Sequence, residues 1–163
     1  MWLPPKRYPL SSRGTRRRAR VSDAHGEMLA LAVKLATKAG AGKTLTASQQ
    51  MVADILWVDT QVSPNGFDGW LYYTSSERIA ATLHALEHLG CLPVLELVRE
   101  ALAIIGVDPF RMPDEQREAQ LDSLVDEARD RLSEVDDRFH EAVEDCMATC
   151  QAFVESHKQE FAV

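Results

Sequence analysis

The fold of this chain is decided by residues 114–153, which read DEQREAQLDSLVDEARDRLSEVDDRFHEAVEDCMATCQAF. Apolar residues recur here at steps of three and four, the spacing of one face of an α-helix. They are Leu121, Val125, Ala128, Leu132, Val135, Phe139, Ala142, Cys146, Cys150 and Phe153. At about 100° per residue these positions share a sector roughly 100° wide. The segment therefore predicts helical structure that packs this stripe against a core.

Acidic side chains occupy the other side of the same segment. Residues 114–145 hold thirteen Asp or Glu against four Arg, which are Arg117, Arg129, Arg131 and Arg138. All four Arg project in or near the edges of the apolar stripe, so the acidic face is nearly pure carboxylate. Like charges four residues apart on a helix cost about 0.2–0.5 kcal/mol per pair. Two interpretations stay open: a plainly solvated face, or a surface shaped for a basic partner.

One helix over residues 114–154 would be far longer than average. We therefore expect a break near Ser133–Asp137, with Asp136 or Asp137 capping the second half. Upstream, helices are predicted over 23–39, from a Thr46 cap to about 62, over 67–73, over 77–89, and from Pro93 to about 105. Residues 64–66 form a turn, Ser75 or Ser76 caps the helix that Gly90 ends, and that helix pairs with the next as an αα-hairpin.

The predicted fold is a single all-α domain of six or seven helices over residues 23–163, preceded by a disordered basic tail over residues 1–22. The tail holds seven Lys or Arg and no acid, which leaves the rest of the chain with a net charge of −14. The tail is interpreted as a stretch ahead of a true start at Met28, as an arm for acidic surfaces, or as a segment that folds back on the acidic helix.

Composition also bounds the partners and the compartment. A body this acidic repels phosphate backbones and attracts basic proteins, so direct binding of nucleic acid by the folded domain is not expected. Three cysteines, an odd number, argue against a disulfide framework and for a reducing compartment. The chain has no apolar run of membrane-spanning length. We expect a cytoplasmic protein without a membrane partner, and a homodimer is left open.

Three motifs raise alternative functions. Residues 39–44 resemble a phosphate loop, but Thr37 stands where the pattern needs glycine, and a helix precedes it instead of a strand. His84 and His88 belong to a His-x-x-Glu-His string that can hold zinc, yet they project away from the apolar face of their helix and lack a third ligand. The aromatic run 67–73 fits a ligand pocket or, more ordinarily, a core. Cys146 and Cys150 are predicted to be buried free thiols.

Several motifs carry a resemblance to a known family. They are Pro64-Asn65-Gly66-Phe67, Trp70–Tyr73, Thr74-Ser75-Ser76, Leu89-Gly90-Cys91 and Val135-Asp136-Asp137-Arg138-Phe139-His140. In order and spacing they resemble a bacterial domain-of-unknown-function family whose best-known member is a DNA-mimic protein. The resemblance covers roughly residues 45–158. The chain departs from the pattern at Pro64, where Asn is usual, at Tyr73, where Asn is common, and in keeping only one Gly in the turn.

The resemblance implies an all-helical fold and a negative surface that occupies the DNA site of a basic DNA-binding protein such as a transcriptional regulator. We therefore predict a non-enzymatic interaction protein without catalytic residues, metal or cofactor. The predicted partner-binding residues are Glu118, Asp122, Asp126, Asp130, Glu134, Asp137, Glu141, Glu144 and Asp145. The alternatives are an enzyme or small-ligand binder that uses residues 67–73 or His84 and His88, and a structural domain whose charge has no specific partner.

Overall fold

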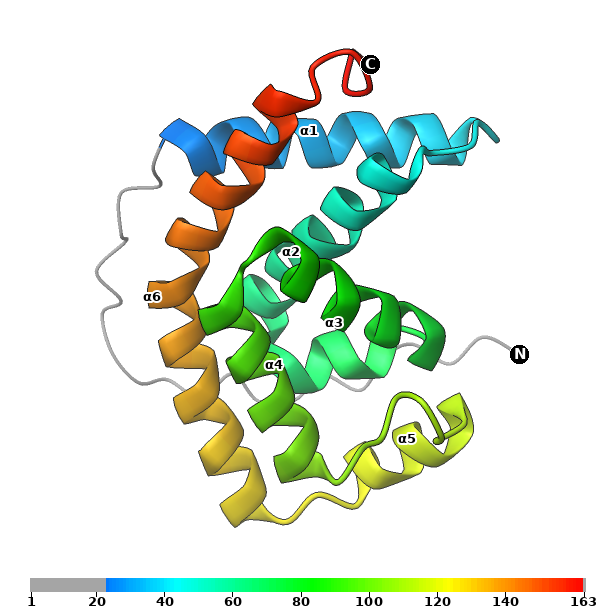
Figure 1. Ribbon diagram of the computed structural model, residues 1–163. Helices are drawn as coiled ribbons and strands as arrows, with labels where there is room; N and C mark the ends of the chain where they lie inside the picture. The colour runs from blue at the N-terminus through cyan, green and yellow to red at the C-terminus, as the bar shows by residue number, and fades with distance from the viewer. Residues whose placement is uncertain (1–22, 163) are drawn as a thin grey trace.

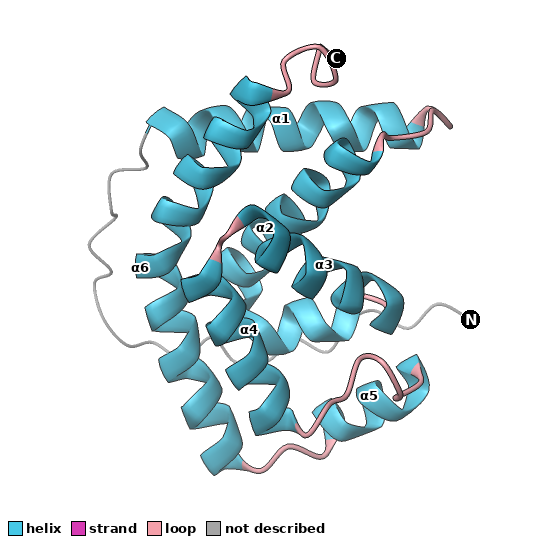
Figure 2. Ribbon diagram, in the orientation of Figure 1, coloured by secondary structure: helices cyan, strands magenta, loops and turns pink. Residues whose placement is uncertain are grey.

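Six α-helices and no strand make up residues 23–162, the part of the chain that the computed structural model describes (Figures 1 and 2). They are α1 (Asp23–Gly40), α2 (Ala47–Tyr73), α3 (Ser76–Leu89), α4 (Leu92–Ile105), α5 (Asp114–Asp122) and α6 (Asp126–Ser156). The predicted all-α class is confirmed. The expectations for the tail, residues 1–22, lie outside the described residues.

The longest helix, α6, organises the domain. It runs along one side of the molecule and contacts α1, α2, α3 and α4 (Figure 1). The helix α1 lies across its C-terminal part, α4 lies alongside its N-terminal half, and α5 packs instead against α2. The core between them is apolar and includes the large side chains Trp70, Phe67 and Phe139.

Local sequence signals set several helix ends, as predicted. The Thr46 side chain accepts a hydrogen bond from the Gln49 backbone N–H, and the Gln49 side chain accepts one from the Thr46 N–H, which together form a capping box. Ser75 caps α3 by accepting from the Arg78 N–H. Gly90 ends α3 in the left-handed conformation, which glycine adopts without a Cβ penalty. The turn from Gly90 into α4 completes the predicted αα-hairpin.

The predicted break near Ser133–Asp137 is wrong. The acidic segment breaks at residues 123–125 instead, and α6 then continues for 31 residues without interruption. Acidic residues in its first turn, Asp126 and Glu127, favour a helix start at this point because they face the positive end of the helix dipole. Val125 precedes α6 and is 66% exposed, so it leaves the predicted apolar stripe.

Asp136 does act as a helix cap, but for another helix. The long helix α2 is interrupted at Gly66, where φ is 76° and ψ is 175°. Because the preceding turn is not helical, no backbone carbonyl is placed to accept from the Phe67 N–H. This N–H donates instead to the Asp136 carboxylate at 2.8 Å. The Phe67 ring also packs edge-on against Phe139, with the ring centroids 5.5 Å apart. The two family motifs, 64–67 and 135–140, therefore meet in space.

The predicted turn at residues 64–66 is thus a kink within α2, and the predicted short helix 67–73 is the second part of α2. Phe67, Trp70 and Leu71 are fully buried, whereas Tyr72 and Tyr73 are exposed. The aromatic run is therefore mainly core.

Candidate functional site

Six carboxylates lie in one row along the outer face of α6, and we call them the α6 acidic row. They are Asp126, Asp130, Glu134, Asp137, Glu141 and Asp145, and all six are exposed. At about 100° per residue they fall in a sector centred opposite the buried side of the helix, on which Leu132, Val135 and Phe139 lie. At 1.5 Å of rise per residue, the row extends for about 28 Å.

The carboxylates of the α6 acidic row lack ion-pair partners in the part of the chain that the structure describes. Among residues 23–162, none of its six carboxylates takes part in an ion pair. Of the four arginines in the segment, Arg117 is buried, and Arg129 donates to the Leu121 carbonyl oxygen. Arg138 pairs with Glu100 of α4 at 2.6 Å, and Arg131 is exposed beside the row. Within residues 23–162 the row therefore presents negative charge that no ion pair neutralises, with the exposed Arg131 beside it.

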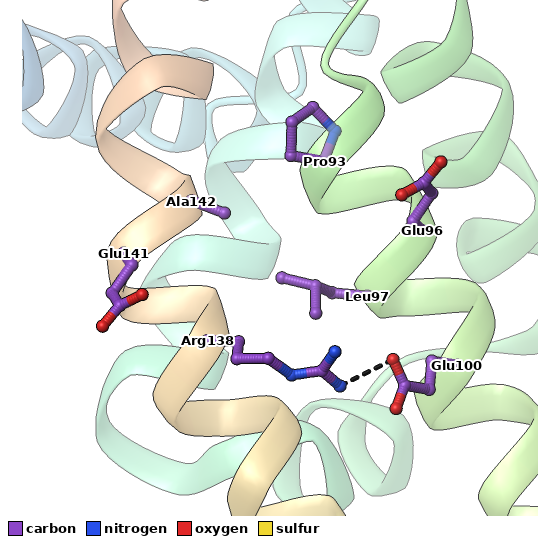
Figure 3. Close-up of a pocket in the computed structure, with 7 residues that line it drawn as sticks. All are labelled: Pro93, Glu96, Leu97, Glu100, Arg138, Glu141 and Ala142. Atoms are coloured by element: carbon purple, nitrogen blue, oxygen red, sulfur yellow. Dashed lines mark ion pairs between the residues drawn. The ribbon is translucent and has the colours of Figure 1, made fainter.

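A shallow groove of about 400 Å³ runs between α4 and α6 (Figure 3). Pro93, Leu97 and Ala142 form its apolar part, and Arg138 extends across it toward Glu100. Glu96 and Glu100 of α4 line the same groove as Glu141 of the row. Glu96 widens the acidic surface, whereas the charge of Glu100 is paired with Arg138. Both were missed by sequence reasoning, because nothing local to α4 shows that it packs beside α6.

Two predicted partner-binding residues lie on another helix. Glu118 and Asp122 belong to α5. Residues 123–125 form a loop between α5 and α6, and the two helices run in different directions (Figure 1). Asp122 is exposed and Glu118 is half-buried. The sequence reasoning placed both in one continuous series of like steps with Asp126, and the structure divides that series. That they bind a partner stays a prediction.

Glu144, also predicted to bind a partner, is half-buried against α1. Its carboxylate bonds to Nδ1 of His25 at 2.7 Å, and Nε2 of the same ring bonds to Asp59 of α2, also at 2.7 Å. His25 is 8% exposed and ties α1 to α2 and α6. Burial lowers the pKa of His25, but hydrogen bonds and charge from Glu144 and Asp59 outweigh it, so the pKa is raised above 6.5. Apart from a lone His in α1, no local pattern predicts this contact.

A second buried polar contact fixes α5 against α2 and α3. Arg117 is 1% exposed and donates to the Leu71 carbonyl oxygen at 2.7 Å and to the Ser76 hydroxyl at 2.6 Å. It also pairs with Asp114 at 2.6 Å. The Ser76 backbone N–H and then the Arg117 guanidinium lower the pKa of Asp114 to about 2. Arg117 is therefore a structural residue, and its own charge is buried and paired with Asp114.

The alternative sites have weaker geometry. His84 and His88 are exposed on α3 with their ring centroids 6.1 Å apart. Within residues 23–162, no His, Cys, Asp or Glu joins them to form a three-ligand group. Cys146 and Cys150 are buried free thiols, as predicted, and a third free thiol, Cys91, is buried with them. None of the described helices combines the length and apolar character needed to cross a membrane, and the cytoplasmic location stays a prediction.

Comparison with known proteins identifies the family. A family model described as DMP19-like protein matches residues 43–157, which include α2 to α6 and therefore the whole α6 acidic row. No curated protein and no solved structure shows a significant match to the chain. The family model covers more than half of the chain and agrees with the resemblance drawn from the motifs at 64–67 and 135–140. The chain belongs to the DMP19-like family.

Proposed function

We propose that this protein is a non-enzymatic DNA mimic, whose α6 acidic row and the neighbouring Glu96 of α4 occupy the DNA-binding surface of a basic protein. The observation that carries the proposal is the row itself: six exposed carboxylates on one side of an unbroken helix, without an ion pair among the described residues. Family membership supports it, since the family's best-known member is a DNA mimic.

The spacing of the row suits this role. Carboxylates four residues apart on a helix lie about 6 Å apart along the axis. One strand of duplex DNA carries one charge per about 3.4 Å of axis. The row therefore presents a line of negative charge at somewhat more than half the density of one DNA strand, and Arg and Lys placed for phosphates can pair with its carboxylates. An unbroken helix also holds the carboxylates in fixed positions relative to one another, which lowers the ordering cost on binding.

Binding of this kind should depend steeply on salt. Six phosphate contacts on DNA make affinity fall by about a thousandfold between about 50 and 200 mM salt. When carboxylates replace the phosphates in the same site, affinity should also fall as salt rises. The fall should be smaller, because a protein face carries fewer condensed counterions than DNA.

The test captures a basic protein at low salt and compares two variants that differ in where acidic residues are reversed. The first variant reverses three residues of the row, Asp130→Lys, Glu134→Lys and Asp137→Lys. The matched control reverses three exposed acids on other elements, Glu77→Lys and Glu87→Lys in α3 and Asp108→Lys after α4, and so has the same net charge. We expect the wild type and the control to capture the same DNA-binding protein, the row variant to lose it, and duplex DNA to displace it.

Two outcomes would contradict the proposal. If both variants lose the partner equally, overall charge and not the row determines binding. If duplex DNA does not compete for the captured protein, the acidic surface does not occupy a DNA site.

A further inference from the structure

All three cysteines of the chain meet at one point in the core. Cys91 lies between α3 and α4, while Cys146 and Cys150 stand one turn apart on α6. Their three sulfur atoms all lie within 4.8 Å of one another. The residues are 2%, 3% and 0% exposed, respectively. Two segments that are 55 residues apart therefore place every thiol of the chain in one cluster, which we call the thiol trio.

The composition of the thiol trio restricts what it can bind. Thiolates are soft ligands that favour thiophilic ions. Structural zinc sites are closed by four protein ligands, but among residues 23–162 the group contains three sulfurs and no His, Asp or Glu. Burial also leaves little room for water as a fourth ligand. The trio therefore suits an ion that is complete with three sulfur ligands.

Charge narrows the choice further. Burying a net charge in an apolar core is costly. Three thiolates around a divalent ion leave a net charge of −1, and around a monovalent ion they leave −2, whereas around a trivalent ion they leave none. We propose that Cys91, Cys146 and Cys150 form a three-coordinate site for a trivalent thiophilic ion of the arsenite class.

The binding step balances without a change of oxidation state. Arsenous acid, As(OH)₃, exchanges its three As–O bonds for three As–S bonds. Each thiol proton leaves with one hydroxide as water, and arsenic stays trivalent. For an ion–sulfur bond of about 2.3 Å, the value in zinc sites, three sulfurs around an ion lie about 4 Å apart or closer. The trio therefore needs only a small contraction, and binding would clamp the start of α4 to α6.

The probe is arsenite, added to the purified full chain under a reductant that contains no thiol. Native mass spectrometry should show one arsenic per chain in place of three protons. At a hundred times the dissociation constant, arsenite should raise the melting temperature by about 5–10 °C. Zn²⁺ at the same concentration should raise it less. This inference does not depend on the proposed DNA mimicry.

Variants assign the ligands. Cys91→Ala, Cys146→Ala and Cys150→Ala should each reduce the arsenite-dependent rise in melting temperature by more than half. Met147→Leu, a change beside the trio at a fully buried position, keeps all three thiols and should retain the rise. Circular dichroism checks that each variant folds.

The mass of the wild-type complex shows how many sulfurs hold the arsenic, even if an alanine variant fails to fold. Arsenic held by two sulfurs keeps one hydroxyl and replaces only two protons. That mass, the absence of bound arsenic, or a larger stabilisation by Zn²⁺ than by arsenite would overturn the proposal.

Discussion

Replacing Gly66 with alanine tests whether the kink in α2 depends on Asp136. The conformation of Gly66, with φ at 76° and ψ at 175°, is one that other residues adopt at a cost of about 1–3 kcal/mol. An added Cβ would lie 2.6 Å from Oδ2 of Asp136, so the carboxylate must move. Its movement weakens the bond from the buried Phe67 N–H, and an unsatisfied buried donor costs about 1–3 kcal/mol. We expect Gly66→Ala to lower the free energy of unfolding by about 2–6 kcal/mol.

Two other glycines provide matched controls in the same urea titration. Gly90 also has a positive φ, of 80°, but an added Cβ would meet nothing within 4 Å, so Gly90→Ala should cost only about 1–2 kcal/mol. Gly26 lies inside α1 with open space around it, and Gly26→Ala should stabilise the protein by about 0.5–1 kcal/mol.

A double variant isolates the contact between the two residues. Asp136→Ala removes both the cap and the obstruction, so Gly66→Ala should cost less in that background by about 0.5–3 kcal/mol. If the two substitutions are additive, or if Gly66→Ala costs no more than Gly90→Ala, the close approach of Asp136 to Gly66 does not determine the kink.

Two further predictions concern the buried polar contacts. Because the pKa of His25 is raised, the stabilisation by protonated His25 is fully present below about pH 6.5 and is lost as pH rises through the folded-state pKa. The difference in melting temperature between wild type and His25→Gln should therefore shrink from about pH 6 to about pH 9. A constant or widening difference would contradict the raised pKa. Arg117→Met should cost about 2–4 kcal/mol in urea denaturation, because the Leu71 carbonyl and the Ser76 hydroxyl both lose their bond to the buried guanidinium. Arg111→Met, at a side chain 88% exposed, should change stability by less than about 0.5 kcal/mol. Equal effects of the two substitutions would refute the structural role of Arg117.

The elements that could be predicted from the sequence are those that local chemistry determines. The caps at Thr46 and Ser75 and the stop at Gly90 depend on residues within a few positions of each helix end. The α6 acidic row was predictable for a similar reason, since helical periodicity alone places its members on one side. The carboxylates of Glu118 and Asp122 were misplaced relative to the row because the break at 123–125 carries weak local signals.

Contacts between distant segments could not be predicted in this way. Asp136 has the sequence context of a cap for its own helix, but its carboxylate binds the Phe67 N–H, 69 residues earlier in the chain. The same limit applies to Glu96 and Glu100 beside α6, to His25 between two carboxylates, and to Cys91 beside the other thiols. Each depends on which helices pack together, and that follows from the whole core.

Asp136 and Asp137 are neighbours with the same side chain but with different roles. One turns inward and holds a kink in another helix, while the other points outward in the acidic row. An Asp→Asn change leaves size almost unaltered and removes one negative charge. At position 136 this change should lower the stability of the fold, and at position 137 it should weaken partner binding. A survey of substitutions along α6 should therefore find that the property affected changes abruptly from one residue to the next.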